Sequence, residues 1–208
     1  MVSMMKKDET KLILLSDTHI YNRKDTIPAV ILDHIREVKP DRILHCGDIC
    51  RMDALDALNA IAPVSAVRGN RDFRCFCSLP RSFDETFQGY RLHMEHGQGD
   101  LISYLRIKMY VTVYNITGKP LDNRKLNHIR PDVNDYDIYC FGHSHFKRLE
   151  MMGHTLLINP GHINVSKPFK PDLPPSFCEL RLGTSGIEVT LSTLTEEGLI
   201  HEHHFFEK

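Results

Sequence analysis

The chain has 208 residues, of which 41% are hydrophobic and 25% charged, as is typical of one soluble globular domain with a full core. A formal net charge of -1 and a pI of about 6.9 exclude the strongly basic surface of nucleic-acid and anionic-membrane binders. The first apolar run, Leu12–Leu15, is too short for a signal peptide or a membrane span, so we expect a cytoplasmic protein with six reduced cysteines.

Strand and helix patterns alternate in the first third of the chain. The short apolar runs Leu12–Leu15, Arg42–Cys46 and Val64–Val67 are typical of strands buried on both faces. Apolar residues at helical spacing predict one helix within Pro28–Pro40 and another over Asp53–Ile61. This alternation predicts right-handed crossovers and a largely parallel sheet.

The pattern changes in the remainder of the chain. Further strands are predicted at Tyr90–Met94, Asp137–Phe141 and Thr155–Ile158, with a short helix at Asp122–Ile129. Four prolines within residues 167–175 indicate an irregular loop, and alternation after residue 177 predicts an antiparallel hairpin. We therefore predict a single α/β domain over residues 1–208, with two face-to-face mixed β-sheets flanked by helices.

Two segments, one apolar and one polar, have more than one interpretation. Leu101–Asn115 is apolar but aperiodic, and it fits either a helix or a strand. Within it, Tyr104–Tyr114 can cover a pocket, form a contact in a homo-oligomer or pack in the core, and we favour the core. The tail His201-Glu202-His203-His204 is interpreted as exposed positions of a terminal strand rather than as a metal site.

Five short polar motifs each follow an apolar run, where a strand is expected to end. They are Asp17-Thr18-His19, Gly47-Asp48, Gly69-Asn70, His96-Gly97 and Gly142-His143-Ser144-His145. Ligands of α/β folds collect beyond the carboxyl ends of strands, so we expect these side chains to meet. Two Asp, one Asn and four His are enough oxygen and nitrogen ligands for two metal ions.

Together these motifs resemble the calcineurin-like metallophosphoesterase superfamily over Lys11 to about Pro160, and most closely its small single-domain phosphodiesterase branch. The resemblance implies that one metal is bound by Asp17, His19, Asp48 and His145. It implies that the other is bound by Asp48, Asn70, His96 and His143, so that Asp48 bridges the two ions.

Mixed Asp, Asn and His ligation without thiolate suits Mn²⁺, Fe²⁺, Ni²⁺ or Zn²⁺, and we expect Mn²⁺. Two such ions ~3.5–4 Å apart can share a hydroxide, formed with a pKa near ~7, that attacks phosphorus in line. The expected activity is therefore hydrolysis of a small phosphate ester by a phosphodiesterase. Nucleic acid and membranes are not expected as partners.

Three alternatives remain open at this point. The same site can serve a phosphomonoesterase or a nucleotide pyrophosphatase. It can also be part of a non-catalytic interaction module, because the superfamily includes a retromer subunit that resembles these enzymes. The complete set of seven ligands favours an enzyme, since packing unpaired polar groups together without cations is costly.

Two positions depart from the wider superfamily pattern. Arg71 follows Asn70 where many members carry a His that is a candidate proton donor, although small members of the branch also lack it. Arginine stays protonated, with a pKa above ~12, so Arg71 either binds phosphate oxygens or pairs with Asp72. His162 stands where relatives often carry Ser, and it is a candidate to contact substrate or to replace the missing acid.

Overall fold

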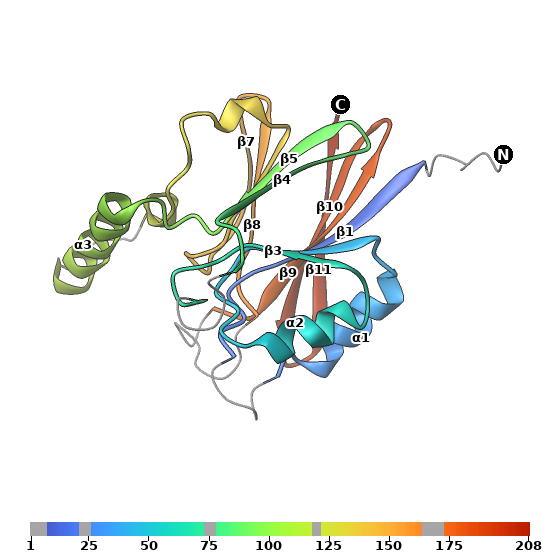
Figure 1. Ribbon diagram of the computed structural model, residues 1–208, viewed down its shortest axis with the longest axis horizontal. Coiled ribbons are helices and arrows are strands. Elements are labelled where there is room, and N and C mark those ends of the chain that lie inside the picture. Colours follow the sequence, from blue (N-terminus) through green and yellow to red (C-terminus); the bar gives the residue numbers. More distant parts are fainter. Residues whose placement is uncertain (1–7, 21–25, 73–77, 118–121, 164–172) are drawn as a thin grey trace.

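The computed structural model describes residues 8–20, 26–72, 78–117, 122–163 and 173–208. Two mixed β-sheets pack face to face, with α1 (Ala29–Val38) and α2 (Met52–Asn59) on the outer side of the first sheet (Figure 1). The predicted fold class is confirmed. None of the helices within these described ranges is long and apolar enough to cross a membrane.

The first sheet has six strands in the order β11-β10-β9-β1-β2-β3. Their bounds are β1 (Glu9–Leu15), β2 (Arg42–His45), β3 (Val64–Ala66), β9 (Ser176–Gly183), β10 (Gly186–Thr195) and β11 (Gly198–Glu207). The strands β1, β2 and β3 are parallel, and α1 and α2 form the crossovers between them. The remaining three strands are antiparallel, which confirms the hairpin predicted after residue 177.

The second sheet has five strands in the order β4-β5-β6-β8-β7. Their bounds are β4 (Ser82–Phe87), β5 (Tyr90–Glu95), β6 (Ile138–Cys140), β7 (Lys147–Met152) and β8 (Thr155–Pro160). The central strands β5, β6 and β8 are parallel, while β4 and β7 are antiparallel edges. The carboxyl ends of β5 and β6 therefore lie at one edge of this sheet.

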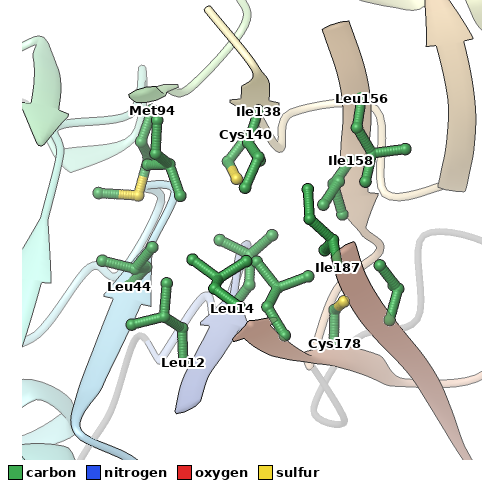
Figure 2. Packing of buried hydrophobic residues seen from close by; sticks show 14 of the residues in the cluster. Leu12, Leu14, Leu44, Met94, Ile138, Cys140, Leu156, Ile158, Cys178 and Ile187 are labelled. Atoms are coloured by element: carbon green, nitrogen blue, oxygen red, sulfur yellow. The ribbon is translucent and has the colours of Figure 1, made fainter. Parts of the chain in front are cut away.

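Alternation along β1 divides the core into two layers. Leu12 and Leu14 point between the sheets and join residues of β5, β6, β8 and β9 (Figure 2). Ile13 and Leu15 point the other way, against the apolar faces of α1 and α2. A strand buried on both faces needs no polar positions, which is why the run from Leu12 to Leu15 lacks any.

The helix α1 shows how local sequence sets the element ends. Pro28 precedes the first helical residue with φ -53°, a value that its ring imposes and that suits a helix start. Ile31 and Ile35 lie one turn apart and are fully buried. Lys39 then adopts a left-handed conformation with φ 52°, and the helix ends before Pro40.

Several predictions of detail differ from the structure. The edge strands β4 and β7 were not predicted, because most of their residues are only partly buried, which gives a weaker pattern than a buried run. The helix predicted over Asp122–Ile129 is a short 3₁₀ turn, η2 (Asn123–Leu126), and a second such turn, η3 (Val133–Asp135), precedes β6. Most of the loop predicted over residues 167–175 lies outside the described residues.

The segment Leu101–Thr117 is a single helix, α3. Core packing of the Tyr104–Tyr114 run, the interpretation favoured from the sequence, is wrong for much of it. Leu105, Met109 and Val113 are exposed, because α3 lies beside the sheets rather than between them (Figure 1). An apolar composition without periodicity does not indicate whether a helix is covered.

Candidate metal centre

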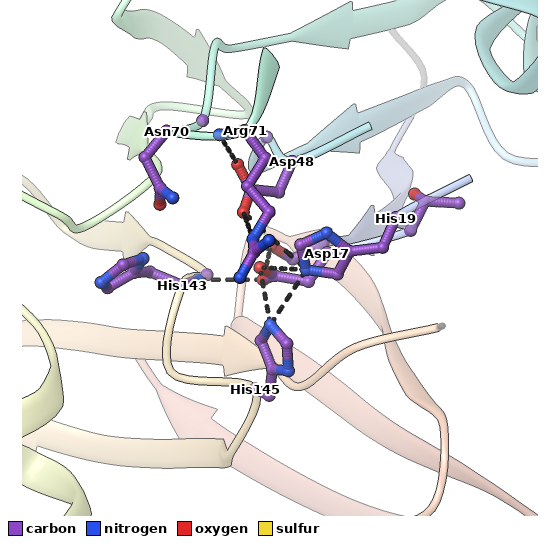
Figure 3. Close-up of polar contacts among 12 residues, drawn as sticks. Asp17, His19, Asp48, Asn70, Arg71, His143 and His145 are labelled. Carbon is purple, nitrogen blue, oxygen red and sulfur yellow. Dashed lines mark hydrogen bonds and ion pairs between the residues drawn. The ribbon is translucent and has the colours of Figure 1, made fainter. Parts of the chain in front are cut away.

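All seven predicted ligands follow parallel strands, just beyond the carboxyl end of each strand. Asp17 and His19 follow β1, Asp48 follows β2, and Asn70 follows β3 in the first sheet. His96 follows β5, while His143 and His145 follow β6 in the second sheet. The side chains converge where the two sheets meet, as Figure 3 shows for six of them.

Two groups of side chains are close enough to hold a metal ion. In the first, Asp17 Oδ1 lies 3.2 Å from His145 Nε2 and 3.5 Å from His19 Nε2, and the two imidazole nitrogens are 3.0 Å apart. The second consists of Asp17, Asp48 and His96. Within each group, the ligand atoms all lie within 4.8 Å of one another.

Asp48 lies between the two sides of the site. Its Oδ2 is 3.8 Å from His19 Nε2, and its Oδ1 is 3.4 Å from His96 Nε2. Asn70 Oδ1 lies 3.2 Å from the same His96 nitrogen, and the rings of His96 and His143 are 5.2 Å apart. One carboxylate oxygen therefore faces each of the two predicted metal positions, an arrangement that suits a bridging ligand.

The hydrogen bonding of Asp17 indicates that a cation fits here. Its Oδ2 accepts from the Ser16 hydroxyl and the His143 backbone N–H. Its Oδ1 is buried without a hydrogen-bond partner among the described residues, although it faces two imidazole rings. An unsatisfied buried acceptor costs about 1–3 kcal/mol, and a divalent ion would satisfy it. The donor set thus fits a divalent metal ion.

The backbone of the site is held in an uncommon conformation. Five of the seven predicted ligands have positive φ, between 48° and 68°, and none of these is glycine: Asp17, His19, Asp48, His143 and His145. Such residues cost of order 1–3 kcal/mol each and persist where the surrounding structure fixes them, often at functional sites.

Asp72 fixes the loop that carries Asp48, and sequence reasoning considered it only as a partner for Arg71. Its buried carboxylate accepts backbone N–H bonds from Asp48, Ile49, Cys50 and Gly69, each at 2.8 Å. It therefore joins the loops after β2 and β3. A carboxylate two residues beyond Asn70 in a turn was the only available signal.

Glycine is required where these loops pass closest to each other. A Cβ on Gly69 would collide with the side chain and backbone of Asp48. A Cβ on Gly142 would likewise collide with Ser16, the residue whose hydroxyl binds Asp17. The glycines of the motifs thus permit close packing of the ligand loops.

Two buried histidines are oriented by backbone contacts. His96 donates from Nδ1 to the Cys46 carbonyl at 2.6 Å, which directs Nε2 into the site. His45, which sequence reasoning missed, accepts the Gly47 N–H on Nδ1 and contacts Thr18 through Nε2. Burial lowers the pKa of His45 to about 4, so it stays neutral and acts as a support.

Opposing influences set the charges of the ligands. Burial alone would raise the pKa of Asp17, but His145 and His19 hold it well below its usual range. Burial, with the charge of His96, lowers the pKa of His143 to about 3. Burial also disfavours a charged His96, but Asp48 and Asp17 raise its pKa to about 9. The two carboxylates thus attract positive charge to the centre, which bound cations would supply.

Arg71 and His162 lie beside this centre. The guanidinium of Arg71 is 3.9 Å from Asp48 Oδ2 and its side chain is 53% exposed; among the described residues it forms no ion pair with Asp72. His162 is buried, with its ring 5.2 Å from that of His145, and it donates from Nε2 to the Leu173 carbonyl. Burial lowers the pKa of His162 to about 4, which makes the imidazole neutral near pH 7 and disfavours a role as acid.

A pocket of about 390 Å³ adjoins the metal centre. It is lined by residues of the loops after β3 and β5 and by the first turn of α3, among them Arg68, Asn70, Arg81, Gln98 and Tyr104. The Tyr104 ring also lies 6.1 Å from the ring of His143. In the part of the chain that the structure describes, no side-chain ion pair is found for Arg68 or Arg81. Two arginines therefore line a space next to the predicted ligands.

Comparison with known proteins identifies the family. Residues 10–182 match the family model of the calcineurin-like phosphoesterase superfamily domain, and the chain belongs to this superfamily. A probable metallophosphoesterase of Methanothermobacter thermautotrophicus is 29% identical over 160 residues, which span 77% of this chain and 81% of that protein. A probable metallophosphoesterase of Methanocaldococcus jannaschii is 29% identical over 154 residues, spanning 74% and 68%.

A solved structure confirms the fold independently. Wild-type Vps29 from Entamoeba histolytica, complexed with Zn²⁺, superposes with a TM-score of 0.70 at 22% identity, covering 95% of this chain and all of that one. At this identity the likeness concerns the fold alone. Membership in the superfamily, together with the candidate ligand groups, supports a metal-dependent phosphoesterase.

Proposed function

We propose that this member of the calcineurin-like phosphoesterase superfamily is a dimetal phosphodiesterase that hydrolyses small phosphate esters. The observation that carries the proposal is the buried Asp17 Oδ1, which lacks a hydrogen-bond partner and faces His19 and His145. The expected metal is Mn²⁺, and the expected location is the cytoplasm. When bound, two divalent cations would activate a water molecule and neutralise negative charge on the phosphoryl group.

The chain's own residues would position the substrate around that chemistry. Asp48 has an oxygen directed to each side of the centre, and the exposed guanidinium of Arg71 is close enough to contact a phosphoryl oxygen near Asp48. A planar guanidinium suits this role because its donors match the geometry of phosphate oxygens. Asp72 would keep the loop of Asp48 in place during turnover.

The adjoining pocket favours a diester over a monoester. A diester carries a second organic group, and about 390 Å³ beside Asn70 gives room for one. Tyr104 offers that group an aromatic surface, while Arg68 and Arg81 offer positive charge. A monoester would leave this space unused.

The non-catalytic alternative gains support from the fold likeness to Vps29 alone. A protein-interaction module has no requirement for a buried carboxylate oxygen that lacks a hydrogen-bond partner and faces two imidazole rings, nor for five ligands at positive φ. We therefore rank it below the enzyme.

The test combines metal analysis with a substrate panel. Purified protein is analysed for metal, stripped with a chelator, and reloaded separately with Mn²⁺, Fe²⁺, Ni²⁺ and Zn²⁺. Bis(4-nitrophenyl) phosphate, 4-nitrophenyl phosphate and a dinucleotide pyrophosphate are then compared by kcat/KM. We expect up to two ions per chain, no turnover after stripping, and the highest kcat/KM for the diester.

Other outcomes separate the alternatives. A preference for the monoester or the pyrophosphate would assign the site to the corresponding alternative class. Metal binding without turnover of any of the three would favour the interaction module. Turnover that persists in metal-free protein would exclude the dimetal mechanism altogether.

A further inference from the structure

The helix α3 carries the largest group of exposed apolar side chains in the described structure. Of eleven exposed large hydrophobic residues, six lie on this helix: Leu101, Ile102, Leu105, Met109, Val113 and Ile116. Each exposes between 49% and 79% of its surface. Figure 1 shows α3 projecting from the side of the molecule, away from α1 and α2. We refer to these six residues as the outer stripe.

The opposite side of α3 is attached to the rest of the chain. Ile107 is buried, the Ser103 hydroxyl contacts His128 at 3.2 Å, and the Tyr110 hydroxyl accepts the backbone N–H of Asp122 at 2.8 Å. Tyr104 also faces the metal centre, as described above. The helix is therefore fixed by its inner side, and the outer stripe points away from the body.

Exposed apolar surface on this scale marks an interaction site, because monomeric soluble proteins rarely expose large contiguous apolar patches. Given their exposed fractions, the six residues expose roughly 700 Å², close to the ~800 Å² per partner of a standard protein interface. We propose that the occupant is a second copy of this chain, whose α3 packs antiparallel against the outer stripe.

The spacing of the outer stripe supports this occupant because it is self-complementary. An antiparallel pair of α3 helices with a two-fold axis at Met109 places Met109 against its own counterpart. The same register places Ile102 opposite the partner's Ile116, and Leu105 opposite the partner's Val113. Large apolar side chains thus face each other over about four turns. Self-complementarity of one surface is the requirement of a two-fold dimer.

The charges on α3 are compatible with the same register. Its only charged residues are Arg106 and Lys108, and it contains no Asp or Glu. In the antiparallel pair, Arg106 lies opposite the partner's Thr112 and Lys108 opposite the partner's Tyr110, so no two like charges are apposed. Two basic residues are also few for an anionic membrane, to which amphipathic helices rich in Lys and Arg bind.

The test measures the mass of the protein in solution and uses charged substitutions to weaken and then restore the dimer. Sedimentation equilibrium should show a concentration-dependent species of twice the 24.0 kDa chain mass. Met109→Lys places two lysines at the two-fold axis and Met109→Glu places two glutamates there. Each variant alone should dimerise at least ~10-fold more weakly than the native chain, equivalent to ~1.4 kcal/mol or more. An equimolar mixture of the two should recover the dimer.

Met151→Lys is the matched control, because Met151 is 48% exposed on β7, away from α3. It should dimerise like the native chain. Circular dichroism on heating should give unchanged melting for all three variants at low concentration, since the changes lie on exposed surface.

Three results would overturn the proposal. The first is a monomer at every concentration up to the solubility limit. The second is a dimer that persists unchanged in Met109→Lys, which would place the interface elsewhere. The third is a monomer that co-sediments with phosphatidylserine vesicles and is released by Met109→Glu, which would assign the outer stripe to a membrane surface.

Discussion

Proteins generally bury apolar side chains and expose polar ones. The metal centre and the outer stripe of α3 both depart from this preference, but in opposite directions. At the centre, polar side chains such as Asp17 and Asp48 are buried. On α3, large apolar side chains such as Ile116 are exposed. Since most residues follow the preference, exceptions of either kind are the informative ones. The two regions differ in the kind of binding partner that would compensate for the exception.

At the centre, the required partner is a small cation, and the chain supplies every other contact. Backbone donors, glycine contacts and buried histidines hold each ligand from several directions. On α3 the required partner is as large as the helix itself, and the chain supplies only the inner contacts. Changes at the centre should therefore impair metal binding and folding, whereas changes on the outer stripe should leave both unaffected.

The largest effect is expected at Asp48. Asp48→Asn removes the negative charge that faces both sides of the centre, so it should lose more metal and more activity than Asn70→Ala, which weakens one side only. We expect a loss in kcat/KM of more than ~100-fold, above the range typical of residues that only orient a ligand. Bound metal and turnover of both variants are compared with those of Met109→Lys, which should match the native chain. Equal, mild effects of the first two would refute the bridging role of Asp48.

The next largest effect is expected at Asp72, where the quantity compared between the two regions is the free energy of unfolding. Each oxygen of the Asp72 carboxylate accepts two backbone N–H groups, and Asp72→Asn replaces one oxygen by an amide NH₂ that faces two of them. It should lower the free energy of unfolding by about 3 kcal/mol or more, because two buried donors lose their acceptor and the negative charge is lost. Urea denaturation measures the loss. Met109→Lys at low protein concentration should change it by less than ~0.5 kcal/mol.

The difference between the two regions also explains what the sequence predicted. The ligand loops were found because each polar motif follows a short apolar or alternating run that is typical of a strand. The supporting residues Asp72 and His45 were not found. Asp72 accepts backbone N–H groups of the loop after β2, and His45 contacts the Thr18 hydroxyl after β1. Only the folded chain brings these segments together.

The exposure of α3 was not predictable for a related reason. Its sequence is apolar on most sides, so periodicity identifies neither an inner nor an outer face. The inner face is defined by single contacts, such as the Tyr110 hydroxyl with Asp122, and the outer face by the exposure of its side chains in the described part of the chain. The edge strand β7 was missed for the lack of a buried run, since most of its residues are only partly buried.

An intermediate effect is expected from the leaving group of the substrate. Arg71 is a poor proton donor, and the lowered pKa of His162 disfavours that residue as an acid. Since general acid catalysis typically contributes ~10²–10⁴-fold, its absence should make turnover depend steeply on leaving-group pKa. A series of aryl and alkyl diesters measures the slope. Arg71→Ala should raise KM by about tenfold, equivalent to ~1.4 kcal/mol, without changing the slope.

A shallow slope in the native enzyme would show that an acid is present. His162→Ala would then identify or exclude His162, because loss of the acid should steepen the slope. Arg71→His provides the reverse comparison, since it introduces an imidazole beside Asp48 and should flatten the dependence. If Arg71→Ala leaves KM unchanged, the guanidinium does not hold the phosphoryl group.

The smallest effect is expected at His93. Its side chain is buried, as at the metal centre, but that of its partner Asp84 is 56% exposed. His93 Nδ1 lies 2.7 Å from Asp84 Oδ1 at the edge of the second sheet. Burial disfavours the charged imidazole, but the Glu95 carboxylate, 3.9 Å from Nε2, and the hydrogen-bonded Asp84 carboxylate raise its pKa above the usual value. A raised pKa in the folded state means that protonation of His93 stabilises the fold. This stabilisation is complete below the unfolded pKa of about 6.5 and is lost as pH rises through the higher folded pKa.

Asp84→Asn should therefore destabilise the protein most near pH 6, and its effect should decrease as pH rises through the folded pKa of His93. The amide keeps an oxygen acceptor, so only the charge is removed. We expect less than ~1 kcal/mol, because water screens a partner that is more than half exposed. Unfolding free energies of native chain and variant across this range give the difference, and Asp56→Asn on the exposed side of α2 is the control. A difference that stays constant with pH would show that His93 is neutral in the fold, and that this buried position, unlike the metal centre, carries no charge.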